Sequence, residues 1–117
     1  MIDEKAQELG RLIGQTEEYK ALKRASDRLR EDKECQRMLT QVEKLAAEIE
    51  LAARQGKEPT PDQAEQYDKA VQSIQGSPVY QQMAVAQANF EKLMAKVNAR
   101  IYEGIQKGAA SPIITLG

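Results

Sequence analysis

The chain of 117 residues contains no histidine and only one cysteine. Without histidine it lacks the usual general base near neutral pH and the commonest metal ligand, so Ser-His-Asp and Cys-His catalysis are excluded. One thiol cannot form an internal disulfide and is compatible with a reducing compartment. We therefore expect a protein that is not an enzyme and that has no catalytic residues, metal site or cofactor.

Aromatic side chains are also scarce, and neither sign of charge is in clear excess. The chain has four Tyr, one Phe and no Trp, and its 17 basic residues are balanced by 18 acidic ones. A core made of aliphatic side chains suits helices packed on helices, and the near-neutral balance argues against direct nucleic-acid binding. No apolar run reaches the length of a membrane span, and the acidic N-terminus lacks a signal peptide's apolar segment. We expect a cytoplasmic protein that does not insert into membranes.

What the sequence does contain is helical periodicity with clear start and stop signals. It predicts an all-α fold of four to five helices in one domain, residues 1–110, followed by an apolar tail, residues 111–117. Four residues are expected to cap helix N-termini: Thr16, Asp32, Thr60 and Ser77. Four glycines are expected to end or break helices: Gly14, Gly56, Gly76 and Gly108.

Two stretches have apolar residues at steps of three and four, which is the spacing of a coiled-coil-like seam. The first runs from Cys35 to Ala52 and the second from Val79 to Ile105. Together they offer more apolar face than one small bundle is expected to cover, so we predict a homodimer or larger assembly. The interface residues predicted on the two seams are Met38, Val42, Leu45, Ile49, Phe90, Leu93, Val97 and Ile101.

The C-terminal tail adds three large apolar residues to this predicted interface, namely Ile113, Ile114 and Leu116. Exposed side chains of this kind favour docking on a neighbouring helix or subunit. The alternative is a frayed end, because chain termini are often disordered. Both interpretations remain open from the residues alone.

Two further patterns have an ordinary structural interpretation. Cys35 shares a seam with Met38 and Val42, so we expect it to be a small buried hydrophobe. Basic residues between Lys20 and Arg37 alternate with acidic ones, which is typical of a solvated helix face rather than an RNA-binding surface.

The pattern of Thr16, Tyr19, Leu22, Ala25 and Leu29 returns 61 residues later as Ser77, Tyr80, Met83, Ala86 and Phe90. Two copies are too few for a repeat array. Two explanations of this repeated pattern remain open. One is chance similarity between two capped amphipathic helices, and the other is duplication of a helical hairpin.

The order T16-E-E-Y-K-A-L-K-R-A, then D32-K-E-C-Q-R-M-L, then a Gly-Lys-Glu-Pro-Thr turn and a second pair of helices resembles the YlbF/YmcA/YheA group of small bacterial proteins. The resemblance extends roughly from Leu9 to Ile105. It implies an all-α protein that self-associates. For the best-studied members it also implies a cytoplasmic complex that assists the membrane-anchored endoribonuclease RNase Y in mRNA maturation and influences competence, sporulation and biofilm formation.

This sequence departs from the pattern in its cysteines. Some members of that complex carry iron–sulfur clusters, which generally need about four thiolates, whereas Cys35 alone could contribute only if subunits pooled their thiols. We expect an adaptor or regulatory protein that binds partners of an RNA-processing complex. The alternative is a structural or scaffold subunit with no connection to RNA.

Overall fold

The computed structural model describes residues 1–110, and residues 111–117 lie outside the described part. The described residues form five helices and no strand. The helices are α1 (Ile2–Gly14), α2 (Glu17–Glu31), α3 (Lys33–Arg54), α4 (Pro61–Gln75) and α5 (Pro78–Ala110). The predicted all-α fold is confirmed.

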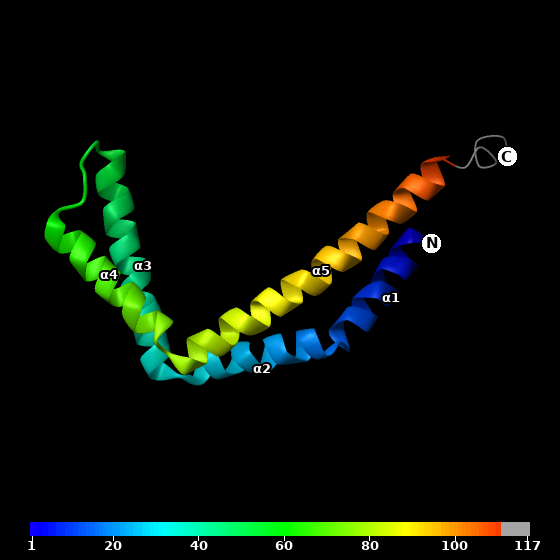
Figure 1. The fold of residues 1–117 in the computed structure, drawn as a ribbon, viewed down its shortest axis with the longest axis horizontal. Coiled ribbons are helices and arrows are strands. Elements are labelled where there is room, and N and C mark those ends of the chain that lie inside the picture. Colours follow the sequence, from blue (N-terminus) through cyan, green and yellow to red (C-terminus); the bar gives the residue numbers. More distant parts are fainter. Residues whose placement is uncertain (111–117) are drawn as a thin grey trace.

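The helices are arranged as two arms that meet at an elbow (Figure 1). One arm is the hairpin of α3 and α4. In the other, α2 lies along the first part of α5, and α1 continues beside the last part of α5. The chain extends 68 × 37 × 19 Å. Its radius of gyration is 21.6 Å, whereas a compact chain of this length has about 13 Å.

Side-chain caps begin the helices where the sequence predicts them. The backbone N–H of Tyr19 donates to Thr16 Oγ1 at 3.1 Å, and that of Cys35 donates to an Asp32 carboxylate oxygen at 2.8 Å. Thr60 and Gln63 form a reciprocal capping box at the start of α4. Each cap supplies a partner for backbone donors that have none inside the helix.

Two of the predicted glycine stops are wrong. Gly14 lies within α1, whose C-cap is Gln15, and Gly108 lies within α5, which continues to Ala110. Glycine weakens a helix by about 1 kcal/mol relative to alanine but keeps its N–H, so it does not end a helix by itself. Gly56, by contrast, has φ of 75° just after α3, a left-handed conformation that glycine adopts without strain.

Polar contacts hold each of the two chain segments that pass through the elbow. Gln36 Nε2 of α3 donates to the backbone oxygen of Leu29 at 2.8 Å, which holds the α2–α3 bend. Gln81 Nε2 of α5 donates to the backbone oxygen of Gln75 at 2.7 Å, which holds the α4–α5 turn. The two arms are therefore joined by ordered corners.

The core is thin and lies along two helix pairs. Ala25 of α2 and Ala86 of α5 are buried in one arm, and Leu45 of α3 is buried in the other. Cys35 and Ile74 are buried near the elbow, at the start of α3 and the end of α4. Small residues such as Ala25 and Ala86 allow two helix backbones to approach closely.

The similarity between segments 61 residues apart extends beyond the residues that first indicate it. Adding 61 to the bounds of α1 gives 63–75, which lies in α4, and adding it to α2 gives 78–92, the first part of α5. Both Thr16 and Ser77 cap the second helix of their pair, and Ala25 and Ala86 are both buried. This correspondence favours duplication of a helix pair over chance similarity, and the pair is not a hairpin, because α1 and α2 follow one another along α5.

Candidate protein-interaction surface

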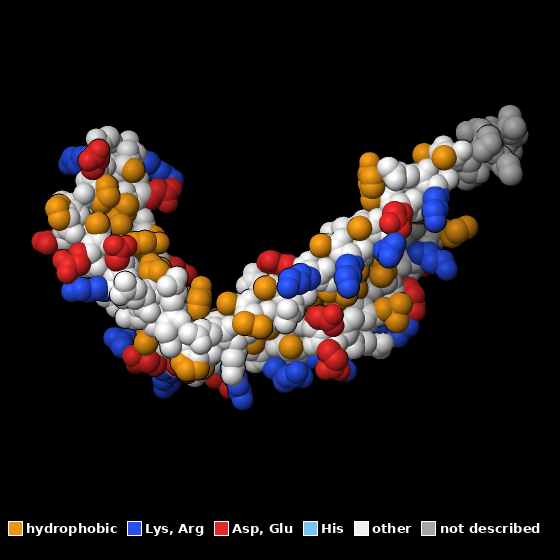
Figure 2. All heavy atoms as spheres, in the orientation of Figure 1, with side chains coloured by type: hydrophobic (Ala, Val, Ile, Leu, Met, Phe, Trp, Pro, Cys, Tyr) orange, Lys and Arg blue, Asp and Glu red, His pale blue; other side chains and the backbone are white. Residues whose placement is uncertain are grey.

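Large hydrophobic side chains are exposed mainly at the free end of the α1 and α5 arm. Of the nine exposed in the described part, six come from residue 1, α1 and the last part of α5. We call five of them the α1/α5 face: Ile2, Leu12, Ile101, Tyr102 and Ile105. Space filling shows hydrophobic and basic side chains interspersed along this arm (Figure 2). Several large apolar side chains exposed at one end of a chain favour an interaction site there.

Packing between α1 and α5 is light. A hollow of about 370 Å³ lies between them, lined by Leu9 of α1 and by Lys96, Val97, Arg100 and Ile101 of α5. In the other arm α4 packs closely along α3. The last part of α5 therefore has only a partial cover, and its stripe becomes exposed at Ile101 and Ile105.

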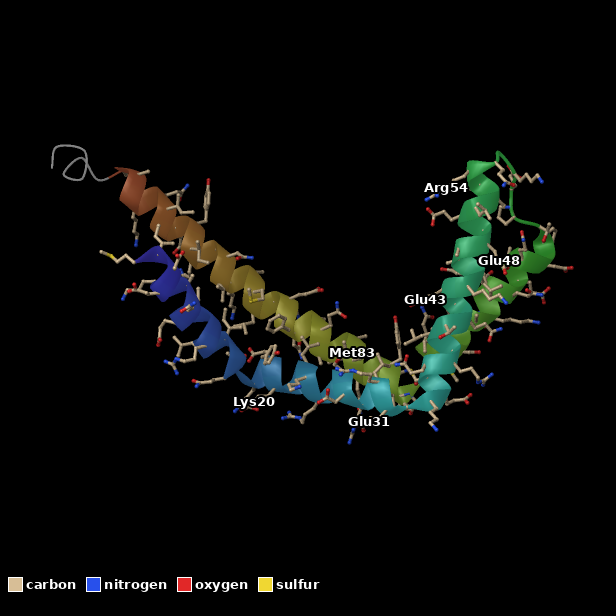
Figure 3. The ribbon with its side chains drawn as sticks, turned by 180° about the vertical axis from the view of Figure 1, so that it is seen from behind. Lys20, Glu31, Glu43, Glu48, Arg54 and Met83 are labelled. Carbon is tan, nitrogen blue, oxygen red and sulfur yellow. The ribbon has the colours of Figure 1, made fainter. Side chains whose placement is uncertain are left out.

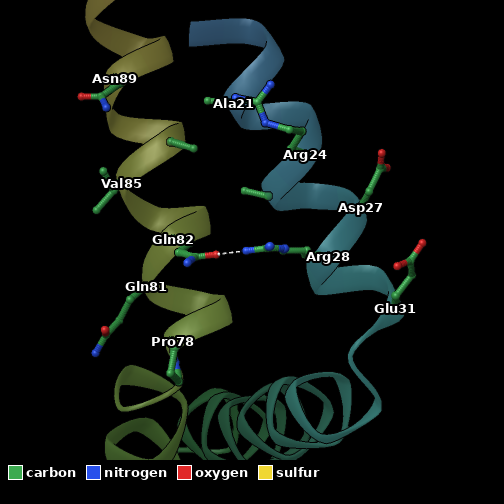
Figure 4. A pocket seen from close by; sticks show the side chains of 12 residues that line it. Ala21, Arg24, Asp27, Arg28, Glu31, Pro78, Gln81, Gln82, Val85 and Asn89 are labelled. Atoms are coloured by element: carbon green, nitrogen blue, oxygen red, sulfur yellow. Dashed lines mark hydrogen bonds between the residues drawn. The ribbon is translucent and has the colours of Figure 1, made fainter. Parts of the chain in front are cut away.

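A second concave feature is the groove between α2 and α5, which has a volume of about 820 Å³ (Figure 4). Arg28 Nη1 donates to Gln82 Oε1 at 2.9 Å across this groove. Polar side chains from both helices line it, together with the exposed Val85. A neighbouring hollow of about 500 Å³ shares Ala21 and Asn89 with it. We call the two together the α2/α5 groove.

The opposite side of the same helix pair has a smaller hollow, of about 330 Å³, which Tyr19 and Leu22 of α2 and Met83 of α5 help to line. Beside this hollow, Tyr19 packs edge-on against Phe90. Lys20 points away from α5 on the outer side of α2 (Figure 3). Both sides of the pair are therefore hollowed, and the larger hollow is the one that Arg28 and Gln82 span.

The predicted interface residues on α3 are placed inside the chain. Leu45 is 8% exposed, and Met38, Val42 and Ile49 are half-buried in the arm that α3 forms with α4. The α3 seam thus finds a cover within the chain. That these residues also contact another chain stays a prediction.

The predicted interface residues on α5 divide into two groups. Phe90, Leu93 and Val97 are half-buried beside α2 and α1, whereas Ile101 is 45% exposed. Ile113, Ile114 and Leu116 lie outside the described residues. The structure thus brings Ile101 together with the half-buried Leu9 of α1, and the contact of Ile101 with another chain stays a prediction.

Sequence reasoning missed Leu12, Tyr102 and Val85 as exposed apolar residues. Each lies off the main stripe of its helix, Leu12 next to Ile13 and Tyr102 next to Ile101. These exposed residues could have been predicted from their position beside the apolar stripe. A helix that packs through its stripe leaves such a side chain uncovered.

Cys35 is buried, as predicted, with 1% of its surface exposed. The Ser77 hydroxyl donates to its Sγ at 3.8 Å, so the thiol is held at the elbow. In this conformation a second chain cannot reach the sulfur. Among residues 1–110 no group of three potential metal ligands gathers at one place.

The charged run on α2 and α3 forms a solvated face with local ion pairs, as predicted. Lys23 and Arg30 both pair with Asp27, and Arg37 pairs with Glu34. All ion pairs of the described part join residues three or four positions apart, so none crosses between helices. No helix within residues 1–110 combines the length and apolarity that a membrane crossing needs.

The fold is shared with two solved structures. RicA of Bacillus subtilis, whose crystal structure is of its complex with RicF, superposes with a TM-score of 0.80 at 20% identity, over 92% of this chain and 96% of RicA. A DUF964 protein of unknown function from Bacillus stearothermophilus superposes with a TM-score of 0.66 at 22% identity, over 95% of this chain and 97% of that one. At these identities the likeness shows the fold alone.

A search of individually curated proteins found no match. The family described as "Control of competence regulator ComK, YlbF/YmcA" matches residues 2–106, nearly the whole chain. The chain therefore belongs to the YlbF/YmcA family, which is linked to the control of competence.

Proposed function

We propose that this protein is a non-enzymatic adaptor, a helical regulator that acts by binding another protein. The observation that carries the proposal is the surface the chain leaves uncovered. Its accessible surface is 9337 Å², whereas a compact monomer of its mass exposes about 6,400 Å². The difference exceeds the roughly 1,600 Å² that a standard protein–protein interface buries in total.

The comparisons support a partner-binding role. RicA, which shares the fold, was crystallised in complex with RicF. The family is associated with control of a competence regulator rather than with a reaction. The absence of histidine from the whole sequence supports a role outside acid–base catalysis.

The partner is, on this proposal, a component of the RNase Y mRNA-processing machinery, as the family resemblance implies. The alternative is a structural or scaffold subunit with no connection to RNA. The two differ in which proteins accompany the chain in the cell, and this difference can be measured directly.

The α2/α5 groove is the surface we assign to the partner. It is elongated, and it offers polar groups from Gln81, Gln82 and Asn89 around the apolar Val85. An amphipathic helix fits such a groove, with one apolar side chain on Val85 and hydrogen-bonding side chains on either side. This assignment leaves the α1/α5 face free.

The test is affinity capture from a native bacterial lysate with the tagged full chain. Recovery of RNase Y or its accessory proteins supports the adaptor, and their absence favours the scaffold alternative. Val85→Asp places a charge in the groove and should abolish the capture. Leu51→Asp is the matched control, because Leu51 is similarly exposed but lies on α3 in the other arm.

A further inference from the structure

We propose that residues 111–117 fold back on their own chain and pack into the hollow between α1 and α5. The hollow is then an intramolecular docking site whose occupant is this segment. It lies next to the α2/α5 groove and shares only Lys96 with it. The inference therefore does not rest on the proposed function.

The hollow presents an apolar surface that α1 leaves open. Leu9, Val97 and Ile101 supply its apolar lining. Leu9 and Val97 are half-buried, whereas Ile101 is 45% exposed. Ile105 lies four residues further along α5, on the same side as Ile101, and is 60% exposed. The apolar surface thus continues from the hollow toward the end of the helix.

The last turns of α5 leave room beside this surface. Gly104 and Gly108 follow Val97 and Ile101 at steps of three and four, the spacing of one helix face. A Cβ atom added at either glycine meets no heavy atom from another part of residues 1–110 within 4 Å. A peptide segment can therefore lie close to the helix backbone here.

The segment begins where it can reach this surface. Ala110 is the last residue of α5, and Ile101 lies nine residues before it, or about 14 Å along the helix axis. Pro112 disfavours a further helical turn, because it lacks an N–H and restricts the residue before it. Residues 113–117 span up to about 17 Å when extended. A chain that reverses direction at Pro112 therefore reaches back to Ile101.

The composition of the segment matches the surface. Residues 111–117 contain no charged side chain and three large aliphatic ones, Ile113, Ile114 and Leu116. In an extended segment Ile114 and Leu116 lie on the same side, because successive side chains alternate. Packing these two side chains into the hollow removes apolar area of both surfaces from water, which favours docking.

A cationic side chain at the hollow can serve the backbone of the docked segment. Lys96 and Arg100 both line the hollow. Arg100 pairs with Glu103 at 3.0 Å, whereas Lys96 pairs with no carboxylate of residues 1–110. An extended segment carries backbone carbonyl groups that need donors. The Lys96 ammonium can donate to them while its aliphatic stem packs on the segment.

Tethering favours this segment over another occupant of similar intrinsic affinity. A segment joined to the site by a short linker acts at an effective concentration in the millimolar range. A second copy or another protein at micromolar concentration is therefore at a disadvantage of about 1,000-fold. Either one must displace the segment to enter the hollow.

The first experiment measures disulfide formation in the full chain under a glutathione buffer. Ile101→Cys with Ile114→Cys joins the hollow to the segment, and the native Cys35 is buried and does not compete. The matched control is Ala99→Cys with Ile114→Cys, because Ala99 is exposed at nearly the same level of α5 but about 200° around the helix. The first pair should close at least about tenfold faster, into a species of monomer mass.

Equal closure of the two pairs would overturn the proposal, because a segment that is not docked reaches both sides of α5. Closure of the first pair mainly between chains, seen as twice the chain mass without reductant, would also overturn it. That result would identify a second copy as the occupant of the hollow.

The second experiment leaves the hollow unaltered. Ile114→Ser with Leu116→Ser removes two apolar side chains of the segment, and Thr115→Ser is the matched control. Amide hydrogen exchange in α1 and the last turns of α5 should be at least about threefold faster in the double variant than in the control. Exchange in α3 and α4 should not change. Equal exchange of α1 and α5 in the two variants would contradict the docking of this segment.

Discussion

The ring of Tyr19 on α2 packs edge-on against the ring of Phe90 on α5, with 5.7 Å between the ring centroids and 60° between their planes. The two residues are far apart in sequence and belong to the two helices with the most extensive mutual packing. Because the chain has only five aromatic residues, this pair is an important anchor of the α2–α5 contact.

Replacing Phe90 tests that anchor. Phe90→Ala should lower the free energy of unfolding by about 2–3 kcal/mol, somewhat less than at a fully buried site, because the ring is half-buried. A double-mutant cycle with Tyr19→Leu and Phe90→Leu should give a coupling of about 0.5–1.5 kcal/mol in urea unfolding. Additive effects would show that the ring contact contributes nothing beyond its buried area.

Leu45 tests the arm of α3 and α4. Its side chain is buried in the arm that α3 forms with α4, so Leu45→Ala should cost about 2–4 kcal/mol of stability. Leu51→Ala, at an exposed position on the same helix, should change stability by only about 0.5 kcal/mol. Similar losses for the two variants in urea unfolding would contradict the packing described for this arm.

Cys35 should be chemically inert in the folded protein, because its sulfur is buried at the elbow. Thiol reagents should label it slowly in the native chain and rapidly after denaturation. Cys35→Ala should cost about 1–2 kcal/mol through a small cavity and leave the oligomeric state unchanged. Stoichiometric iron and sulfide in anaerobically purified protein would show that the thiol has a ligand role instead.

Asp32 should stabilise the elbow through its cap on α3. Asp32→Ala removes the acceptor of the Cys35 N–H and should cost about 1 kcal/mol in thermal or urea unfolding. Asp32→Asn keeps an acceptor oxygen and should retain most of that stability. An alanine variant as stable as the parent would show that another group satisfies this backbone donor.

Local features were predictable from the sequence because their causes lie within a few residues. The Thr60 and Gln63 capping box involves side chains three positions apart, and the caps at Thr16 and Asp32 have equally short range. Gly14 and Gly108 misled the prediction because glycine permits a helix end without requiring one.

The long-range arrangement was less predictable. The stripe on α3 showed which face is apolar, but the same stripe suits a helix of its own chain or of another. The structure covers Leu45 in the α3–α4 arm and leaves Ile101 exposed. Which face remains open depends on how α1 sits against α5, and residue spacing does not specify that contact.

The central structural claim is that this chain associates with further copies of itself, and its mass in solution tests that claim most directly. Sedimentation equilibrium of the full chain at micromolar concentration should give at least twice the chain mass of 13.1 kDa. The account expects that mass to fall as concentration decreases, by mass action. A single species of 13.1 kDa throughout the micromolar range would contradict it.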